Sequence, residues 1–103
     1  MQKLVTEFKI EGDGAKISKK GIQRLIIIPK DLHHELAKLK DTEYIIEVKI
    51  KDPASKDVTS LRIIGKVSKM AEQRQIFIPI KLHKEIKKLD NKKYAITISI
   101  HEI

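Results

Sequence analysis

The apolar positions of this chain change from strand spacing to helical spacing at a proline. Residues 25–28 form a continuous apolar run that stops at Pro29, and the leucines that follow, up to Leu39, recur at helical spacing. Proline ends the pairing of a strand but is tolerated in the first turn of a helix. The pattern therefore predicts a strand that leads directly into a short helix, over roughly residues 30–39.

The same order of features returns in the second half of the chain. An apolar run at residues 76–78 is followed there by Pro79 and by three apolar residues at helical spacing, Leu82, Ile86 and Leu89. From Lys16 to Ile50 the two copies match without a gap at a shift of 50 positions. The residues identical at that shift include Gln23, Arg24, Pro29, Leu32, His33, Glu35, Lys38, Leu39, Tyr44, Ile46 and Ile50. Coincidence does not produce a match of that length, so the chain is a tandem repeat.

The repeat extends to the first strand of each copy. The pattern of residues 5–10 returns in residues 58–63 at a shift of 53, so the first copy carries three extra residues around Glu11, Gly12 and Asp13. We therefore expect one domain, residues 1–103, made of two internal repeats at residues 4–50 and 57–103.

Alternation of apolar and polar residues predicts the remaining strands. In residues 5–10, Phe8 and Ile10 share one face while Glu7 and Lys9 share the other, which is typical of a half-buried strand. A loop is expected at residues 21–24, which begin with Gly21, and a clear turn at residues 51–57, which are rich in turn-forming residues. The other extended segments are 15–20, 43–50, 58–63, 66–69 and 93–100.

A chain of 103 residues can bury one modest core, so the two repeats must share it. Each copy reads as strand, strand, helix and strand. We expect a mainly β fold with two short helices, in which the repeats interleave about a pseudo-twofold axis into one small β-barrel. The last strand has no hairpin partner after it, so it should pair with the first strand and bring the termini close together.

Composition narrows the classes of function. The absence of Cys excludes a disulfide framework and a Cys-ligated metal site. No apolar stretch approaches the roughly 18 residues of a membrane span, and the N-terminus lacks an apolar signal segment, so we expect a cytoplasmic protein without a membrane partner. The net charge of +8 and the pI of about 9.7 favour a polyanionic partner. The aromatic fraction of 4% argues against a stacking platform for single strands.

Four features of the first copy, repeated in outline in the second, resemble a known family. They are a basic strand start, an apolar strand that ends in proline, a helix opening and an alternating strand: Lys16-Ile17-Ser18-Lys19, Ile28-Pro29, Lys30-Asp31-Leu32 and residues 44–50. This set resembles the N-terminal domain of the AbrB/SpoVT family, which includes antitoxins of the MazE kind. The resemblance covers nearly the whole chain, twice.

The resemblance implies a swapped-hairpin barrel, which in the family is normally assembled from two short chains that bind DNA as a dimer through basic strand and loop residues. One chain here would supply both halves. Double-psi and riboflavin-synthase-like barrels of the cradle-loop type are the nearest structural alternative. The resemblance implies a Gly about five residues before the Pro, and the chain departs from that pattern because Gly21 lies eight residues before Pro29 and its counterpart is Ala71. The family's Gly-Asp turn before the final strand is replaced by Lys40-Asp41 and Asp90-Asn91.

Basic residues that recur under the repeat are the candidate DNA contacts, because a twofold set of cations suits the local twofold symmetry of a duplex. We expect Arg24 and Arg74 to read base edges, since the guanidinium offers a bidentate fork to guanine, with Gln23 and Gln73 assisting at adenine. The alternative is that all of these are ordinary outward residues of a basic barrel. The complete predicted DNA-binding set is Lys9, Lys16, Lys19, Lys20, Gln23, Arg24, Arg62, Lys66, Lys69, Gln73 and Arg74. A further excess of lysines, read either as a solvated helix face or as part of a binding surface, comprises Lys81, Lys84, Lys87, Lys88, Lys92 and Lys93.

No pattern in the chain predicts catalysis, a metal or a cofactor. His33 and His83 recur on the predicted helices, but neighbouring positions on a helix point apart and do not form a metal site. We interpret them as surface or cap-adjacent residues. The residues that break the repeat, Asp13, Asp31 and His34, are not tied together by any motif, and the chain has no Gly-rich phosphate loop.

The sequence therefore predicts an AbrB-like, DNA-binding regulator of transcription rather than an enzyme. Its partner would be double-stranded DNA, with a second copy of the chain or a protein partner left open. The alternative is an antitoxin-like or adaptor module that binds proteins and has no DNA specificity of its own, and an enzyme of the cradle-loop kind ranks third.

Overall fold

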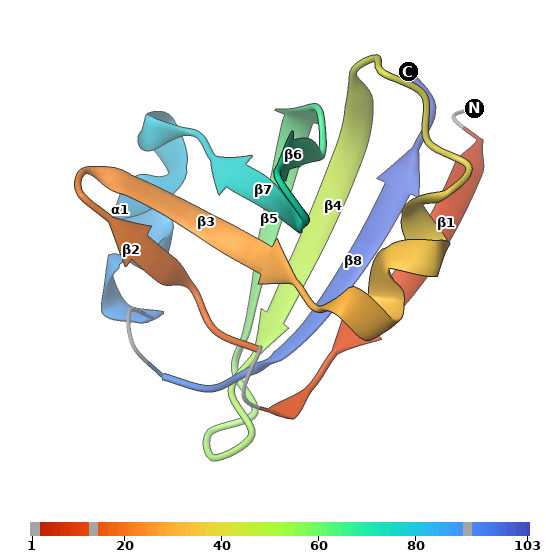
Figure 1. Cartoon of the computed structure of the whole chain (residues 1–103). Coiled ribbons are helices and arrows are strands. Elements are labelled where there is room, and N and C mark those ends of the chain that lie inside the picture. The colour runs from red at the N-terminus through yellow and green to blue at the C-terminus, as the bar shows by residue number, and fades with distance from the viewer. Residues whose placement is uncertain (1–2, 13–14, 90–91) are drawn as a thin grey trace.

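The computed structural model describes residues 3–12, 15–89 and 92–103 (Figure 1). Its strands are β1 (Leu4–Ile10), β2 (Ser18–Lys20), β3 (Gln23–Ile28), β4 (Tyr44–Lys51), β5 (Val58–Gly65), β6 (Ser68–Met70), β7 (Gln73–Ile78) and β8 (Ala95–His101). Its helical elements are the 3₁₀ helix η2 (Lys30–Leu36) and a composite second helix of η3 (Ile80–Leu82), α1 (His83–Ile86) and η4 (Lys87–Leu89). The fold is mainly β with two short helical segments, as predicted. Each repeat has one strand more than expected before its helix, because β2 and β6 are separate strands.

The strands form two antiparallel sheets that cross over one another (Figure 1). One sheet has the order β1-β8-β4-β5 and the other has the order β2-β3-β7-β6. The expected closed barrel is not formed by these two sheets. The reason is that β2 and β6 are three residues long and pair only with β3 and β7, so no described ladder joins the edge strands β1 and β5 to the second sheet.

The predicted pairing of the first strand with the last is confirmed. β1 runs antiparallel to β8, with Phe8 opposite Ile98 and Ile10 opposite Ile96. Beyond the ladder, the Glu102 N–H donates to the Lys3 carbonyl at 2.8 Å, and the two ends of the chain lie side by side (Figure 1). The N-terminal strand β1 is thus an edge strand of the first sheet, and the C-terminal strand β8 lies next to it.

The pseudo-twofold axis is visible in the strand registers. At the centre of the second sheet, Ile26 of β3 lies opposite Ile76 of β7, its own equivalent in the other repeat. At the centre of the first sheet, Val48 of β4 lies opposite Ile98 of β8, which is again its equivalent. The axis therefore passes through the middle of both sheets, and the shared core lies between them.

The three extra residues of the first copy interrupt β1 without ending its pairing. Gly12 has a φ of +73°, and the Ala15 N–H donates to its carbonyl at 3.2 Å. The ladder then resumes, because the Tyr94 N–H donates to the Ala15 carbonyl at 2.7 Å. Tyr44 lies opposite Gly65 in the same way in the other repeat. Asp13, which belongs to this insertion, lies outside the described residues.

Isoleucine side chains from the facing sides of both sheets fill the core. The helices close its two open sides, since Leu36 of η2 and Ile86 of α1 are both buried. η2 ends at Leu36, earlier than the predicted helix, although single turns continue to Leu39, whose N–H donates to the Leu36 carbonyl at 3.1 Å. The chain then turns into β4, where the Tyr44 hydroxyl accepts the Lys40 N–H at 2.7 Å.

Two-residue turns connect β2 to β3 and β6 to β7. The first positions of these turns have positive φ, +62° at Gly21 and +56° at Ala71. A positive φ at the first position alone is the geometry of a type II′ hairpin turn, which favours glycine there. The predicted four-residue loop over residues 21–24 is wrong, because Gln23 and Arg24 already belong to β3. The extended segment before the turn therefore folds back as a tight hairpin.

Candidate nucleic-acid interface

The recurrent basic residues lie mainly on the two hairpins. Lys19 of β2 lies opposite Arg24 of β3, and Lys69 of β6 lies opposite Arg74 of β7. β3 and β7 are antiparallel, and Arg74 lies opposite Ile28. The two arginines are therefore four residues, or roughly 13 Å, apart along the ladder. The two Lys–Arg pairs occupy opposite ends of the second sheet.

Arg24 is buried beneath the second helix instead of projecting from the hairpin. Its side chain is 9% exposed, and its Nη1 lies 3.3 Å from Nδ1 of His83. The other ring nitrogen of His83, Nε2, lies 2.9 Å from the Ile78 carbonyl. Because a carbonyl only accepts, this network assigns the hydrogen to Nε2 and leaves Nδ1 to accept from the guanidinium. Arg24 thus ties the β2–β3 hairpin to the helix of the other repeat.

Arg74 has a different environment from its equivalent. It is half-buried, and it lines an open hollow with Lys69, Lys30 and Glu72. His33 borders the same hollow and repeats the helix contact of His83, with Nε2 at 2.9 Å from the Ile28 carbonyl. Both histidines therefore fasten a helix to the end of the strand before it. The sequence placed them near the helix start but gave no sign of this contact.

The two predicted glutamines, Gln23 and Gln73, also differ in their hydrogen bonding. Gln23 is exposed opposite Lys20 at the tip of the first hairpin. Gln73 lies opposite Met70, and its Nε2 donates to Oε1 of the buried Gln75 at 3.0 Å. Gln23 is thus available to a ligand from solvent, whereas one donor of Gln73 is already occupied.

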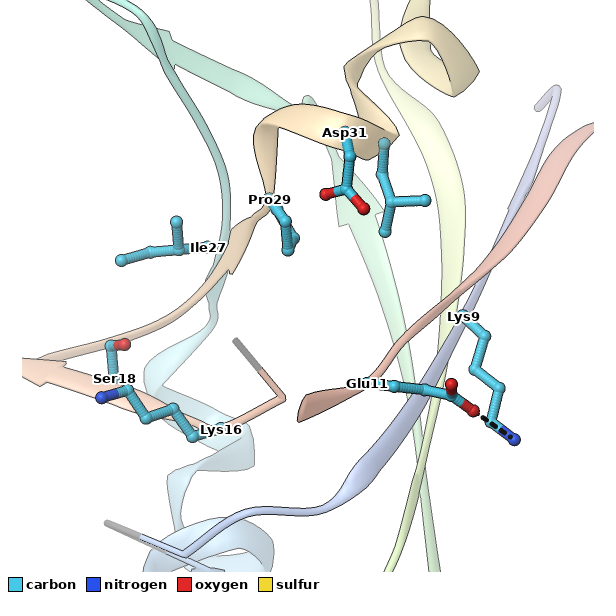
Figure 2. Close-up of a pocket in the computed structure, with 8 residues that line it drawn as sticks. Lys9, Glu11, Lys16, Ser18, Ile27, Pro29 and Asp31 are labelled. Carbon is cyan, nitrogen blue, oxygen red and sulfur yellow. Dashed lines mark ion pairs between the residues drawn. The ribbon is translucent and has the colours of Figure 1, made fainter. Parts of the chain in front are cut away.

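Lys9 and Arg62 lie on the outer face of the first sheet, in its two edge strands. Arg62 faces Glu47 across β4 and β5, while Lys9 forms an ion pair with Glu11 at 3.2 Å. Lys9 and Glu11 border a hollow of about 480 Å³ (Figure 2), and Lys16 borders it from the other side. The remaining lining residues shown in Figure 2 include Ser18, Ile27, Pro29 and Asp31. Because Glu11 and Asp31 offset Lys9 and Lys16, this hollow has no excess of positive charge.

Each hairpin packs against the helix of the other repeat. The Arg24–His83 contact joins the first hairpin to the second helix, and the Ala15–Tyr94 backbone bond joins the segments that flank them. We call residues 15–24 and 80–93 the basic end of the molecule. The Lys30–Glu72 ion pair at 3.3 Å joins the second hairpin to the first helix in the same way. We call residues 65–74 and 30–43 the mixed end.

The two ends differ strongly in charge. The sequence of the basic end carries ten Lys and Arg residues against two acidic ones, whereas the mixed end carries six against five. At the mixed end, Lys30 pairs with Glu72 and Lys66 pairs with Asp41 at 3.4 Å. On the first hairpin and the second helix of the basic end, seven exposed lysines form no ion pair within 4.0 Å among the described residues: Lys16, Lys19, Lys20, Lys81, Lys84, Lys87 and Lys88.

Substitutions between the repeats explain this difference. Glu72 and Lys30 of the mixed end correspond to Ile22 and Ile80 of the basic end, and Asp41 corresponds to Asn91. The acidic residues that neutralise one end are therefore missing from the other. These differences are present in the aligned sequences of the two copies. They indicate a difference in charge between two ends only because each hairpin lies against the helix of the other repeat.

Outside these two ends, one carboxyl group has a shifted pKa. In the turn between β4 and β5, the hydrogen bond from the Ala54 N–H lowers the pKa of Asp52. That bond, to Oδ1, is 2.8 Å long. The turn contains none of the predicted site residues, so this shift concerns the turn itself.

The described residues contain no group of three or more His, Asp or Glu side chains placed to hold a metal ion. Among the described helical elements, none has the length and apolar character needed to cross a membrane. Comparison of the chain with family models, curated proteins and solved structures finds no match.

Proposed function

We propose that this protein binds double-stranded DNA through its basic end and acts as an AbrB-like regulator of transcription in the cytoplasm. The observation that carries the proposal is the group of seven exposed lysines on the first hairpin and the second helix that have no ion-pair partner in the described part of the chain. Such a group can neutralise several phosphates at once, and each neutralised phosphate releases condensed counterions. Lysines that are already paired with carboxylates gain less from the same contact.

The shape of the molecule supports a duplex as the partner. Its extents are 34 × 33 × 26 Å, and the longest of them is comparable with one turn of duplex, which rises about 34 Å. The proposed roles differ along the surface. Lys16, Lys19 and Lys20 of the hairpin contact one backbone segment, and the lysines of the second helix contact another. Gln23 is an exposed, uncharged polar side chain beside the hairpin tip and is the candidate for a base contact.

Arg24 has a positioning role in this proposal, because its guanidinium is buried against His83. It holds the hairpin against the second helix and so brings the two groups of lysines together. Direct base readout by Arg24 and Arg74, expected from the sequence, stays a prediction. The burial of Arg24 favours phosphate contact by the lysines over that readout.

The crossed arrangement of hairpins and helices supports a swapped-hairpin relation to AbrB-like barrels. Each hairpin packs on the helix of the other repeat, as Arg24 with His83 and Glu72 with Lys30 illustrate. In two-chain members of the family the same exchange would take place between subunits. The fused chain would then be equivalent to one such dimer, with its two DNA-binding ends made unequal.

Fluorescence anisotropy of a labelled random-sequence duplex, measured over a salt series, tests the proposal. We expect log affinity to fall linearly with log salt, with a slope near −0.9 for each phosphate contacted. The variant Lys81→Gln/Lys84→Gln should reduce the magnitude of that slope by about 1.8. The control, Lys38→Gln/Lys40→Gln in the segment that follows η2 at the mixed end, should leave it nearly unchanged. Absence of binding by the unmodified protein at low salt would contradict the proposal.

A protein-binding module is the second candidate, and an apolar hollow at the mixed end favours it. Ile27, Pro29 and Met70 line this hollow beside the Lys30–Glu72 pair. An antitoxin-like or adaptor protein would use such a surface for a partner and would have no need of DNA. The salt series separates the two candidates, because a protein-binding module would show no slope that depends on the lysines of the basic end.

A further inference from the structure

The tip of the basic end carries an exposed apolar pair among its lysines. Ile22, the second residue of the β2–β3 turn, is 79% exposed, and Ile80, at the start of η3, is 72% exposed. The β3–β7 ladder ends where Arg24 lies opposite Ile78, but the repeat-equivalent positions at the mixed end, Glu72 and Lys30, are within 3.3 Å of each other, so the pseudo-twofold relation places Ile22 and Ile80 close together. Lys20 and Lys81 lie two residues and one residue away in sequence, so the apolar pair is flanked by cations.

The other end of the molecule shows that the fold does not require this pair. The equivalent positions are occupied there by Glu72 and Lys30, which form an ion pair at 3.3 Å. A polar, solvated pair is therefore compatible with the same turn and the same helix start. β-branched apolar residues are not favoured in tight turns, which are usually built from Gly, Asn, Asp, Ser and Pro. The exposed pair at the basic end calls for an explanation outside the fold.

We propose that Ile22, supported by Ile80, is a wedge that enters the minor groove of bound DNA, partly unstacks one base step and bends the duplex. This inference rests on the proposed function and specifies how the DNA is deformed. Apolar side chains act in this way in minor-groove proteins, where they kink the duplex by roughly 20–90° towards the major groove. The lysines around the tip would hold the backbones on both sides of the opened step.

The dimensions of the hairpin fit this role. Its two strand axes are about 4.8 Å apart, and the atomic radii on the outer side of each strand make the hairpin wider than a regular minor groove of about 6 Å, so the tip enters only if the groove widens. Unstacking one step and bending the duplex away from the protein widens the groove at that point. The energetic cost is smallest at flexible pyrimidine–purine steps such as TA. We therefore expect a preference for duplexes with a central TA step over duplexes with a stiff A-tract.

An anionic membrane surface would also attract lysines around an apolar tip, but the geometry favours DNA. Stable insertion at a membrane interface depends on a large apolar face, or on lipid chains. Two isoleucines offer little apolar area, whereas a single inserted side chain is sufficient to unstack a base step.

Bending is tested by energy transfer between dyes at the two ends of a 30-base-pair duplex that carries a central TA step, with saturating protein. We expect binding to raise the transfer efficiency above that of free DNA. Ile22→Gln should bind with an unchanged salt slope and with affinity reduced by less than about tenfold, but it should leave the efficiency at the value of free DNA. Ile64→Gln, at an isoleucine 62% exposed on β5, is the matched control and should bend DNA as the unmodified protein does.

The outcomes separate failure of the wedge from failure of DNA binding. If Ile22→Gln bends DNA as strongly as the unmodified protein, or if the unmodified protein binds without any change in transfer, the wedge is overturned while DNA binding stands. If anisotropy shows no binding at low salt, the proposed function fails and the wedge fails with it. Co-sedimentation with vesicles of phosphatidylcholine and phosphatidylserine, by a protein that does not bind the duplex, would also overturn the wedge and identify a membrane surface as the partner.

Discussion

At the scale of single residues, Ala71 occupies a backbone conformation that suits glycine. Its φ is +56°, and its equivalent in the first hairpin is Gly21, with a φ of +62°. A side chain at positive φ is strained, and at Gly21 an added Cβ would meet no atom within 4 Å. The difference between the two turns is therefore a matter of backbone energy and not of packing.

We expect Ala71→Gly to raise the free energy of unfolding by about 1 kcal/mol, because relief of the strain exceeds the entropy that glycine adds to the unfolded chain. Gly21→Ala should lower it by a similar amount. Urea unfolding followed by circular dichroism measures both variants. A decrease in stability for Ala71→Gly would show that the turn does not hold Ala71 at positive φ.

A second prediction at this scale concerns the contact between Arg24 and His83. A double-mutant cycle with Arg24→Ala and His83→Ala should give a coupling of about 0.5–1.5 kcal/mol. Arg74 and His33 are not hydrogen-bonded to each other in the described part of the chain, so the cycle with Arg74→Ala and His33→Ala should give less. Equal couplings in the two cycles would contradict the difference between the two ends.

At the scale of elements, the two faces of β3 separate core from surface. Ile26 is fully buried opposite Ile76, whereas its neighbour Ile27 is 37% exposed on the other face. We expect Ile26→Ala to cost about 2–5 kcal/mol of stability and Ile27→Ala to cost less than about 1 kcal/mol. Chemical denaturation of both variants checks the comparison. Equal losses would mean that the register of β3 against β7 is wrong.

The sequence predicted most of these elements because their signals are local or repeated. Alternation located β1, β4, β5 and β8, and the repeat predicted that β8 pairs with β1. The short length of the first turn was not predicted, since Gln23 and Arg24 resemble loop residues in composition although they pair with β2. The closed barrel was also expected, but the three-residue strands β2 and β6 leave the two sheets unjoined.

The candidate site was harder to predict than the fold, because it depends on contacts between distant segments. Arg24 and His83 are 59 residues apart in sequence, and no periodic pattern indicates that they meet. Repeat-equivalent cations were grouped as one twofold surface, but the antiparallel pairing of β3 with β7 separates them. The lysines of the second helix, for which the sequence left open a solvated face or a binding surface, belong to a helix that contacts the first hairpin through Arg24 and His83.

At the scale of the whole molecule, a nearly symmetric fold carries an asymmetric charge distribution. Ten cations and two acidic residues belong to the basic end, against six and five at the mixed end. The repeat gives two ends with the same backbone arrangement of hairpin and helix. Substitutions at a few exposed positions then give each end a different surface charge. A ligand that recognises charge therefore meets one end of the molecule in preference to the other.

The internal repeat provides the most direct test of this account. Lys16→Gln/Lys19→Gln removes two unpaired cations from the basic end, and Lys66→Gln/Lys69→Gln removes their exact equivalents from the mixed end. In anisotropy titrations of duplex DNA over a salt series, the first variant should reduce the magnitude of the slope of log affinity against log salt by about 1.8. The second variant should leave the slope nearly unchanged. Equal reductions in the two variants would contradict a one-sided interface and favour a twofold one. No reduction in either variant would show that the first hairpin is not part of the DNA-binding surface.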